Sequence, residues 1–324
     1  TVTAENGATV KIFSNGDLLG TATNTSGTTH TFTPSSGIAD GNYSITATAT
    51  DGVGNVSAEA TPQNIIIDTV KPAVPVISSA ALTNDTTPTV TGTAEVGSAV
   101  TAVIAGATYT VTATDGTWSV NTGSATPASG SLSLNVNGNN SVSVTATDAA
   151  GNVSSAGTQT LVIDSTAPTV AITDNNSGTA NSDVTYTITF SEPVDGFSVD
   201  DVTVANGTKG TFTQESSTVY TLVVTPNTNS TSAITVDIAG NVATDTAGTN
   251  NTAASQSSQA VDTAAPSTPT IASITTPDHD NTPTITVTAE NGATVKIFSN
   301  GDLLGTATNT SGTTHTFTPS SGIA

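Results

Sequence analysis

The sequence predicts an all-β chain of small sandwich domains, arranged end to end in tandem. Apolar and polar residues alternate with a period of two in short runs, which is typical of half-buried strands. Gly, Asn, Asp and Pro separate these runs roughly every 8–12 residues, and no segment of the sequence shows helical periodicity. About seven short strands in a unit of roughly 95 residues are the pattern of an immunoglobulin-like β-sandwich.

Three junctions divide the chain into units. At each junction an apolar strand end is followed by one Asp and then by a short segment closed by Pro. The junction residues are Asp68, Asp164 and Asp262, and they are 96 and 98 residues apart. Because Pro does not continue a β-ladder, we expect each junction to separate two domains.

An internal repeat defines the array. Residues 1–39 recur without change as residues 286–324, which indicates tandem repeats, and we expect both ends of the chain to fall inside a domain. The opening strand that the first domain lacks has its counterpart, by repeat, within 263–285. The predicted domains are 1–68, an Ig-like domain lacking its first strand; 69–164, an Ig-like domain; 165–262, an Ig-like domain of a second subtype; and 263–324, the truncated start of the next Ig-like repeat.

The alternation pattern of the second domain predicts its strands. Trp118 is expected in the core. Tyr43 in the first domain has the position of a tyrosine corner, at the start of the penultimate strand, and Asn140 takes that place in the second domain. The strands are expected near 73–80, 87–95, 98–104, 107–113, 117–121, 130–136, 140–147 and 153–163.

The composition limits the functions open to this chain. Its 324 residues include 25 Asp and Glu but only 4 Lys and Arg, which gives a net charge of −21. This balance argues against nucleic-acid binding and suits the binding of cations. The sequence has no Cys, so a small extracellular domain of this kind needs a staple other than a disulfide. No apolar run is long enough to predict membrane insertion.

The sequence contains no recognisable catalytic motif, and we expect that the protein is not an enzyme. It lacks a Ser-His-Asp arrangement with a nucleophile elbow, a P-loop and a dinucleotide fingerprint. His30 and its copy His315 lie in Thr-rich segments and are expected to be exposed strand residues. His279 fits a solvated turn better than a metal ligand.

Acidic residues recur at equivalent places in each domain. The penultimate strand ends in Asp-x-x-Gly-Asn, and the second strand ends in Glu. In a sandwich, the loops after these two strands share the end at which the preceding linker enters, so the acids of one junction should converge. The predicted sets are Asp68, Glu95, Asp148 and Asn152; Asp164, Glu192, Asp237 and Asn241; and the partial sets Asp262 with Glu290, and Glu5 with Asp51.

Converging carboxylates repel one another unless a cation lies between them. Ca²⁺ is the predicted cofactor, because it accepts about six to eight oxygen ligands in loose geometry. Asp85, Asp174 and Asp183 lie at the far ends of the preceding domains and are candidates for further ligands or a second ion. The alternative interpretation is that these Asp, Asn and Gly residues serve turn geometry alone.

Three sequence segments carry a resemblance to known protein families. Residues 84–95 (NDTTPTVTGTAE) and 145–152 (TATDAAGN) are similar to the bacterial Ig-like repeats of giant type I-secreted, RTX-type calcium-dependent adhesins, and 189–194 (TFSEPV) resembles a sister Ig-like type. The resemblance covers the whole chain. It implies an extracellular stalk on the bacterial cell surface, stiffened by calcium at the junction residues named above. Such a stalk projects a distal binding region for cell adhesion or biofilm formation.

The expected partners are therefore calcium ions and neighbouring repeats of the same chain, with the adhesive ligand elsewhere in the parent protein. Two alternatives remain open. One is a segment of a surface filament or sheath subunit, and the other is an Ig-like module that binds carbohydrate or protein. A cluster of aromatic residues would favour a binding module, and with one Trp and four Tyr the sequence indicates none.

Overall fold

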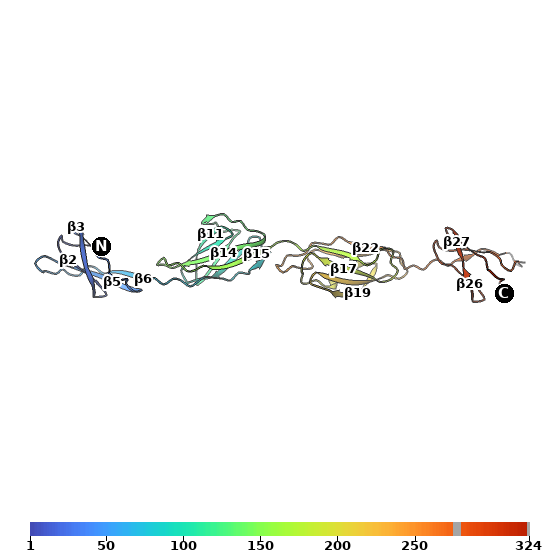
Figure 1. The fold of residues 1–324 in the computed structure, drawn as a ribbon, viewed down its shortest axis with the longest axis horizontal. Helices are drawn as coiled ribbons and strands as arrows, with labels where there is room; N and C mark the ends of the chain where they lie inside the picture. The colour runs from blue at the N-terminus through green and yellow to red at the C-terminus, as the bar shows by residue number, and fades with distance from the viewer. Residues whose placement is uncertain (275–279, 323–324) are drawn as a thin grey trace. The chain divides into compact units, whose positions relative to one another are not determined.

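The computed structural model describes residues 1–274 and 280–322, and its regular structure is almost entirely β (Figure 1). One 3₁₀-helix, η1 (Val199–Asp201), is present, and the described residues contain no α-helix. The all-β prediction is confirmed. None of the helices in the described ranges is long and apolar enough to span a membrane. The chain forms two compact units, Thr1–Thr166 with Ala247–Thr249, and Ala167–Thr246 with Asn250–Ala324.

The first domain is built on one six-stranded sheet with the order β1-β4-β3-β2-β5-β6. Its small core consists of Val10, Ile12, Ala22 and Ala47. The strand β6 exposes most of its residues, in contrast to the alternating burial of β2. The strands are β1 (Val2–Thr3), β2 (Thr9–Ser14), β3 (Asp17–Ser26), β4 (Thr29–Thr31), β5 (Gly41–Thr50) and β6 (Gln63–Ile67).

The second domain has two sheets, ordered β13-β11-β10-β14-β15-β8 and β12-β9-β7. Trp118 is buried in the core between them, as predicted, and its indole N–H donates to the Thr93 carbonyl at 3.3 Å. The strands are β7 (Val76–Ile77), β8 (Leu82–Thr83), β9 (Thr89–Thr93), β10 (Ala99–Ile104), β11 (Ala107–Thr112), β12 (Thr117–Asn121), β13 (Ser129–Gly130), β14 (Asn137–Thr147) and β15 (Gly157–Asp164).

Most of the strands predicted for the second domain are present, but the one expected at 130–136 is not. Only Ser129–Gly130 forms a strand there. Leu132 and Leu134 pack against the core as partly buried side chains outside any ladder. Their alternation therefore reflects burial without strand pairing.

Position 92 in β9 requires Gly, because its neighbours approach the backbone too closely for a side chain. A Cβ there would lie 2.0 Å from the Val76 carbonyl oxygen and 2.6 Å from the Trp118 ring.

The third domain has the sheets β16-β17-β20-β19 and β18-β21-β22. Phe190, Phe197 and Tyr220 meet edge to face in its core, with ring centroids 5.0–5.9 Å apart. Burial, together with the charge of Asp174, raises the pKa of Tyr186 to about 12. The strands are β16 (Val170–Asp174), β17 (Val184–Phe190), β18 (Val202–Ala205), β19 (Gly207–Gln214), β20 (Val219–Pro226), β21 (Ile234–Ile238) and β22 (Ser257–Gln259).

The described part of the last domain has the sheets β23-β24-β28-β27 and β25-β26. Its core includes Ile285, Val287 and Ile297. In each of the four regions every sheet is made of strands from one predicted domain, and no sheet among the described residues crosses a junction. The strands are β23 (Thr270–Ile271), β24 (Ile285–Thr288), β25 (Lys296–Ser299), β26 (Asp302–Thr306), β27 (Thr308–Ser311) and β28 (Thr314–Phe317).

The tyrosine-corner position is used in both domains of the first unit. The Tyr43 hydroxyl donates to the Ala39 carbonyl at 2.8 Å. Asn140 is buried and binds the backbone in two directions, because its Nδ2 donates to the Asn135 carbonyl at 2.9 Å and its Oδ1 accepts from the Asn135 N–H at 2.7 Å. An amide thus takes over the backbone bonding that a phenol provides in the first domain.

The prediction that His30 and His315 are exposed is wrong, since each is only 1 % exposed. His30 is the inward-facing residue of the three-residue strand β4. Its Nε2 lies 3.2 Å from the Ala8 carbonyl oxygen, and its Nδ1 lies 3.3 Å from the Thr28 carbonyl oxygen. The polar ring is therefore satisfied inside the sandwich. His279 lies outside the described residues.

Candidate metal centre

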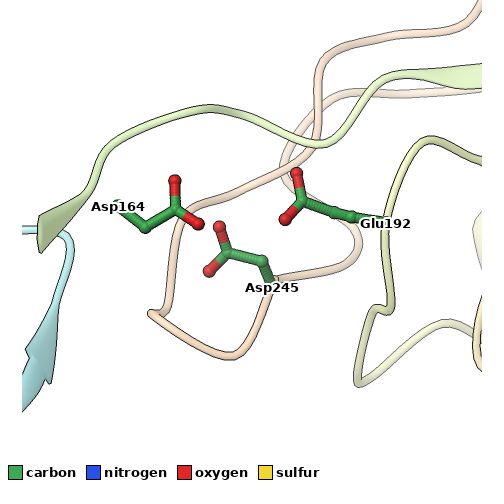
Figure 2. Close-up of side chains that lie close together, drawn as sticks. All are labelled: Asp164, Glu192 and Asp245. Carbon is green, nitrogen blue, oxygen red and sulfur yellow. The ribbon is translucent and has the colours of Figure 1, made fainter. Parts of the chain in front are cut away.

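One group of three acids is close enough to hold a metal ion. Asp164, Glu192 and Asp245 each offer a carboxylate oxygen, and these oxygens all lie within 4.8 Å of one another. Figure 2 shows the three carboxylates turned toward a common point. Asp164 and Glu192 are partly buried and Asp245 is buried, with 5 % exposed. Within the described ranges no other His, Cys, Asp and Glu residues form such a group of three.

Asp164 is placed by the end of β15 and by a turn of its own. It is the last residue of the strand, opposite Asn137 of β14. One carboxylate oxygen accepts the Thr166 N–H at 3.1 Å, and the Asp164 carbonyl oxygen accepts the Thr249 hydroxyl at 2.9 Å. The Asx turn occupies Oδ1 and holds the side chain at the start of the linker.

Glu192 follows β17 in a segment that is bonded on both sides. The Ser191 N–H donates to the Thr169 carbonyl at 2.9 Å, and the Ser191 hydroxyl accepts the Thr169 N–H at 3.0 Å. Two residues later, Val194 is buried and its N–H donates to the Ser217 carbonyl at 3.1 Å. These contacts fix the backbone from which Glu192 projects.

Asp245 lies on the long loop that follows β21, and a buried amide clamps this loop. Asn251, which is 3 % exposed, accepts the N–H groups of Val242 and Ala243, each at 2.9 Å, and donates to the Ala239 carbonyl at 3.0 Å. Thr244 and Asp195 also exchange two backbone hydrogen bonds, at 2.8 and 3.1 Å. This pairing draws the Asp245 loop to the segment that carries Glu192.

The structure brings Asp164 and Glu192 together, but it replaces the predicted Asp237 by Asp245. Asp237 lies inside β21, between the buried residues Val236 and Ile238, and so faces away from the core. Its carboxylate accepts a hydrogen bond from the Gln256 side chain. Asn241 turns the backbone at φ 64° and donates its N–H to the Asn251 carbonyl, so it shapes the loop.

The sequence does not predict Asp245, because the Asp-x-x-Gly-Asn motif occupies different structural positions in the second and third domains. In the second domain, β14 ends at Thr147 and Asp148 opens the loop, whereas β21 continues one residue past Asp237. The loop acid of the third domain is therefore a later Asp. The signal in the sequence is a second acidic turn sequence, Thr244-Asp245-Thr246-Ala247-Gly248, whose Asp lies four residues beyond the end of the motif.

At the first junction the loop acid is committed to its own turn. Asp148 Oδ1 accepts the N–H groups of Ala150 and Asn152 at 2.9 and 2.8 Å, and Oδ2 accepts the Asn152 side-chain amide at 2.8 Å. These bonds, led by the one from the Asn152 side chain, hold the pKa of Asp148 below its usual value of 3.8. The Asn152 amide also donates to the Asp68 carbonyl at 3.0 Å. An amide therefore joins loop and linker here, and Asp68, Glu95 and Asp148 do not form a group of three close carboxylates.

Several other predicted ligands also make turn bonds. Asp51 repeats the Asp148 arrangement with Asn55, whose backbone and side-chain N–H groups lower the Asp51 pKa. The backbone carbonyls of Glu5, Glu95 and Glu290 each accept an N–H three residues on. The carboxylates of four Asp residues accept the backbone N–H two residues on: Asp68 from Val70, Asp85 from Thr87, Asp174 from Asn176 and Asp262 from Ala264. The Asp183 carboxylate instead accepts the hydroxyl of Thr225, which is distant in the sequence.

Family comparison agrees with the fold. Residues 1–69 and 76–165 match one family model described as a bacterial Ig-like domain, and residues 164–261 match a second model with the same description. The chain therefore belongs to the bacterial Ig-like domain family, and it carries these domains in tandem. A search of curated proteins finds no match.

The solved structures that are similar to this chain include the following three. Fibronectin(III)-like modules of Clostridium thermocellum CbhA are 18% identical, with 51% of this chain and 82% of that chain covered and a TM-score of 0.33. A 1.5-MDa bacterial ice-binding adhesin is 21% identical, with 81% of this chain and 88% of that chain covered and a TM-score of 0.37. A tetra-tandem repeat in the extending region of a large adhesion protein is 20% identical, with 98% of this chain and 84% of that chain covered and a TM-score of 0.31. Values this low support no argument about function.

Proposed function

We propose that this chain is a structural extender segment of a bacterial cell-surface adhesin, and that Ca²⁺ bound at the linker after Asp164 limits its bending. The chain is then a non-catalytic spacer. Its partners are calcium ions and the neighbouring repeats, and it places a distal adhesive region away from the cell for adhesion or biofilm formation. The observation that carries the proposal is the convergence of Asp164, Glu192 and Asp245.

Charge supports a cation at this group. At an effective dielectric constant of about 20, two ionised carboxylates about 5 Å apart repel each other by roughly 3 kcal/mol. The chain has only 4 Lys and Arg, so its own basic residues are too few to neutralise 25 acids. A hard divalent cation with oxygen ligands relieves this repulsion, and Ca²⁺ tolerates the irregular geometry of carboxylates from a linker and two loops.

The residues around the group can supply further oxygen ligands. The loop 239–250 offers backbone carbonyl oxygens, and its Thr244, Thr246 and Thr249 add hydroxyl groups. Side chains from two loops and the linker Asp then act on one ion, so ion binding restricts the residues after Asp164. Calcium also stabilises the folded state by mass action, by about 2.7 kcal/mol when its concentration is 100 times the dissociation constant.

An extracellular location and secretion by the type I route follow from the resemblance to adhesin repeats and belong to the same proposal. The extracellular space holds calcium at concentrations suited to weak sites, which have dissociation constants of roughly 10⁻⁴–10⁻³ M. A chain without Cys gains no disulfide staple there, and a bound ion takes over that role.

Solution X-ray scattering of the whole chain tests this function. The profile is recorded in millimolar Ca²⁺ and again in chelator, beside an Asp245→Asn variant. We expect calcium to reduce the flexibility of the wild-type chain and to leave the variant unchanged. A wild-type profile that does not respond to calcium would contradict a calcium-stiffened extender.

A further inference from the structure

The chain contains six Asn-Gly pairs, and the structure holds their Asn side chains in different ways. In such a pair the backbone nitrogen of Gly can approach the side-chain amide of Asn, because Gly has no Cβ to hinder it. The Asn residue of every pair is exposed, so exposure does not distinguish the six. The pairs begin at Asn6, Asn15, Asn137, Asn206, Asn291 and Asn300.

Two of these side chains are held by residues that are distant in the sequence. Asn15 exchanges two hydrogen bonds with Ser44: its Oδ1 accepts the Ser44 N–H, and its own N–H donates to the Ser44 carbonyl, each at 2.9 Å. The Asn137 Oδ1 accepts both the N–H and the hydroxyl of Ser165, at 2.9 and 2.8 Å. Each amide must be released before its Cγ can meet the next backbone nitrogen.

A third side chain, that of Asn206, is held on both sides of its turn. Its Nδ2 donates to the Ala233 carbonyl at 2.8 Å, and its own carbonyl accepts the Asn227 N–H at 3.2 Å. Asn300 repeats the turn of Asn15, with φ 51° against 50°. The turns of Asn15, Asn137 and Asn206 are thus each bonded to another part of their own domain.

Asn291 and its repeat Asn6 lack such contacts. Neither side chain makes a hydrogen bond among the residues that the structure describes. Asn291 is the first central residue of a β-turn, which the Ala293 N–H closes by donating to the Glu290 carbonyl at 3.1 Å. Gly292 follows at φ 83°, and no atom lies within 4 Å of the place of a Cβ. The turn around Asn6 has the same values.

The second domain shows that this turn position stays open when both sheets of a sandwich surround it. There the Ser98 N–H donates to the Glu95 carbonyl at 3.1 Å, and Gly97 has φ 80°. Val96 takes the place of Asn291 in this turn and is 71 % exposed. The same backbone therefore carries an apolar residue in one domain and an amide in another.

We propose that Asn291 and Asn6 are sites of spontaneous deamidation, which the fold directs to these two turns. The backbone nitrogen of Gly292 attacks Cγ of Asn291, the Cγ–Nδ2 bond breaks, and ammonia leaves with the proton of the Gly292 N–H. Water then adds to one of the two carbonyl groups of the resulting succinimide ring. The ring opens to aspartate or to isoaspartate, and no metal ion or enzyme takes part.

The fold protects the three held side chains from the same reaction. Their amides are bonded in the native structure, and these hydrogen bonds must open before Cγ can rotate toward the next nitrogen. Deamidation of the held residues should therefore be about tenfold slower or more, which corresponds to roughly 1.4 kcal/mol of activation free energy. The protected residues are Asn15, Asn137 and Asn206.

The two products change the turn in different ways. Aspartate at position 291 places a second carboxylate next to that of Glu290, in a chain whose net charge is already −21. Isoaspartate adds a carbon to the backbone between Glu290 and Ala293, which disturbs the hydrogen bond that closes the turn. The second domain escapes both changes, because Val96 has no amide to lose.

Peptide mapping by mass spectrometry tests the inference after the intact, folded chain has been incubated in chelator at mildly alkaline pH. Cleavage at the Lys residues that do not precede Pro places Asn6 on 1–11, Asn291 on 210–296 and the three protected residues together on 12–209. Fragment spectra locate the mass change that follows when an amide becomes an acid. We expect conversion at Asn6 and Asn291 to be at least about tenfold faster than at any protected residue.

Asn291→Val is the matched variant, because the second domain carries Val96 in the same turn. It should abolish the change at position 291 and leave conversion at Asn6 at the wild-type rate. Incubation in urea is the second control, since unfolding should remove the protection and bring the rates of all these residues together. Equal rates in the folded chain, or a difference that persists in urea, would overturn the proposal.

Discussion

The loops that follow β14 and β21 occur at the same place in two related domains, yet they use their acids differently. In the second domain Asp148 accepts three hydrogen bonds from its own turn, two of them from Asn152. In the third domain the loop is held by Asn251, and Asp245 lies beside Asp164 and Glu192. One acid stabilises a turn, whereas the other is in a position to bind an ion.

The difference shows what an Asp-x-x-Gly-Asn motif encodes. In the first two domains the motif is a self-contained turn, in which the side-chain amide of the terminal Asn donates a hydrogen bond to the Asp carboxylate. In the third domain the buried Asn251 bonds the loop backbone, and the Asp245 carboxylate lies beside those of Asp164 and Glu192. The motif alone therefore predicts a turn, and the ion site depends on what else supports the loop.

The largest expected effect is that of Asp245→Asn. The substitution keeps the shape and removes the charge of the most buried of the three acids. We expect the calcium-dependent stabilisation to disappear, which is a loss of about 2.7 kcal/mol at a calcium concentration 100 times the dissociation constant. Thermal unfolding of wild type and variant, each in calcium and in chelator, measures it. An equal calcium response in both proteins would show that Asp245 is not a ligand.

Glu192→Gln should have a smaller effect, because Glu192 is less buried than Asp245 and the new amide oxygen has more freedom to adjust to the ion. Calcium affinity should fall about tenfold, equivalent to roughly 1.4 kcal/mol. In chelator the variant should be as stable as wild type or more stable, because one repulsive charge is gone. Calcium titration combined with unfolding in chelator separates the two effects. A variant that is destabilised in chelator would indicate a structural role for the Glu192 carboxylate instead.

The comparison also predicts that the Asp148 loop responds to pH and not to calcium. Its pKa is lowered in the folded state, so its contribution to stability is complete above the usual value of 3.8 and is lost as the pH falls through the lower folded value. Asp148→Asn should unfold at lower denaturant concentration above pH 3.8, and the difference from wild type should shrink below it. Trp118 lies in this domain and is the only Trp in the chain, so its fluorescence reports the transition.

The smallest effect is expected for Asp237→Asn, which serves as the control for Asp245→Asn. Asp237 is partly exposed on β21, where an Asn can still accept the hydrogen bond from Gln256. Stability should change by no more than about 0.5 kcal/mol, and the calcium response should stay at the wild-type level. A large loss of calcium binding here would restore the motif Asp as the ligand and would remove the distinction between the two loops.

The sequence predicted the fold class because period-two alternation and turn spacing depend on local geometry. Trp118 and the use of the corner position by Tyr43 and Asn140 follow from the same pattern. His30 did not, because a polar residue can be buried where three backbone and amide groups surround it, and no sequence pattern marks those partners.

The candidate site was predictable only in part. Asp164 and Glu192 are tied to strand ends, whose place in a sandwich follows from topology. Asp245 depends on where β21 ends and on how Asn251 folds the long loop, and both are set by tertiary packing. A shift of the strand end by two residues is enough to place Asp237 on the sheet and to bring Asp245 to the group instead.

Isothermal titration of the whole chain with CaCl₂, beside Asp245→Asn and Asp237→Asn, tests the central claim most directly. The account predicts saturable calcium binding in the wild type and in Asp237→Asn, and loss of a binding event in Asp245→Asn. If the wild type shows no saturable binding, or if Asp245→Asn binds calcium as the wild type does, then the Asp164, Glu192 and Asp245 group is not a calcium site.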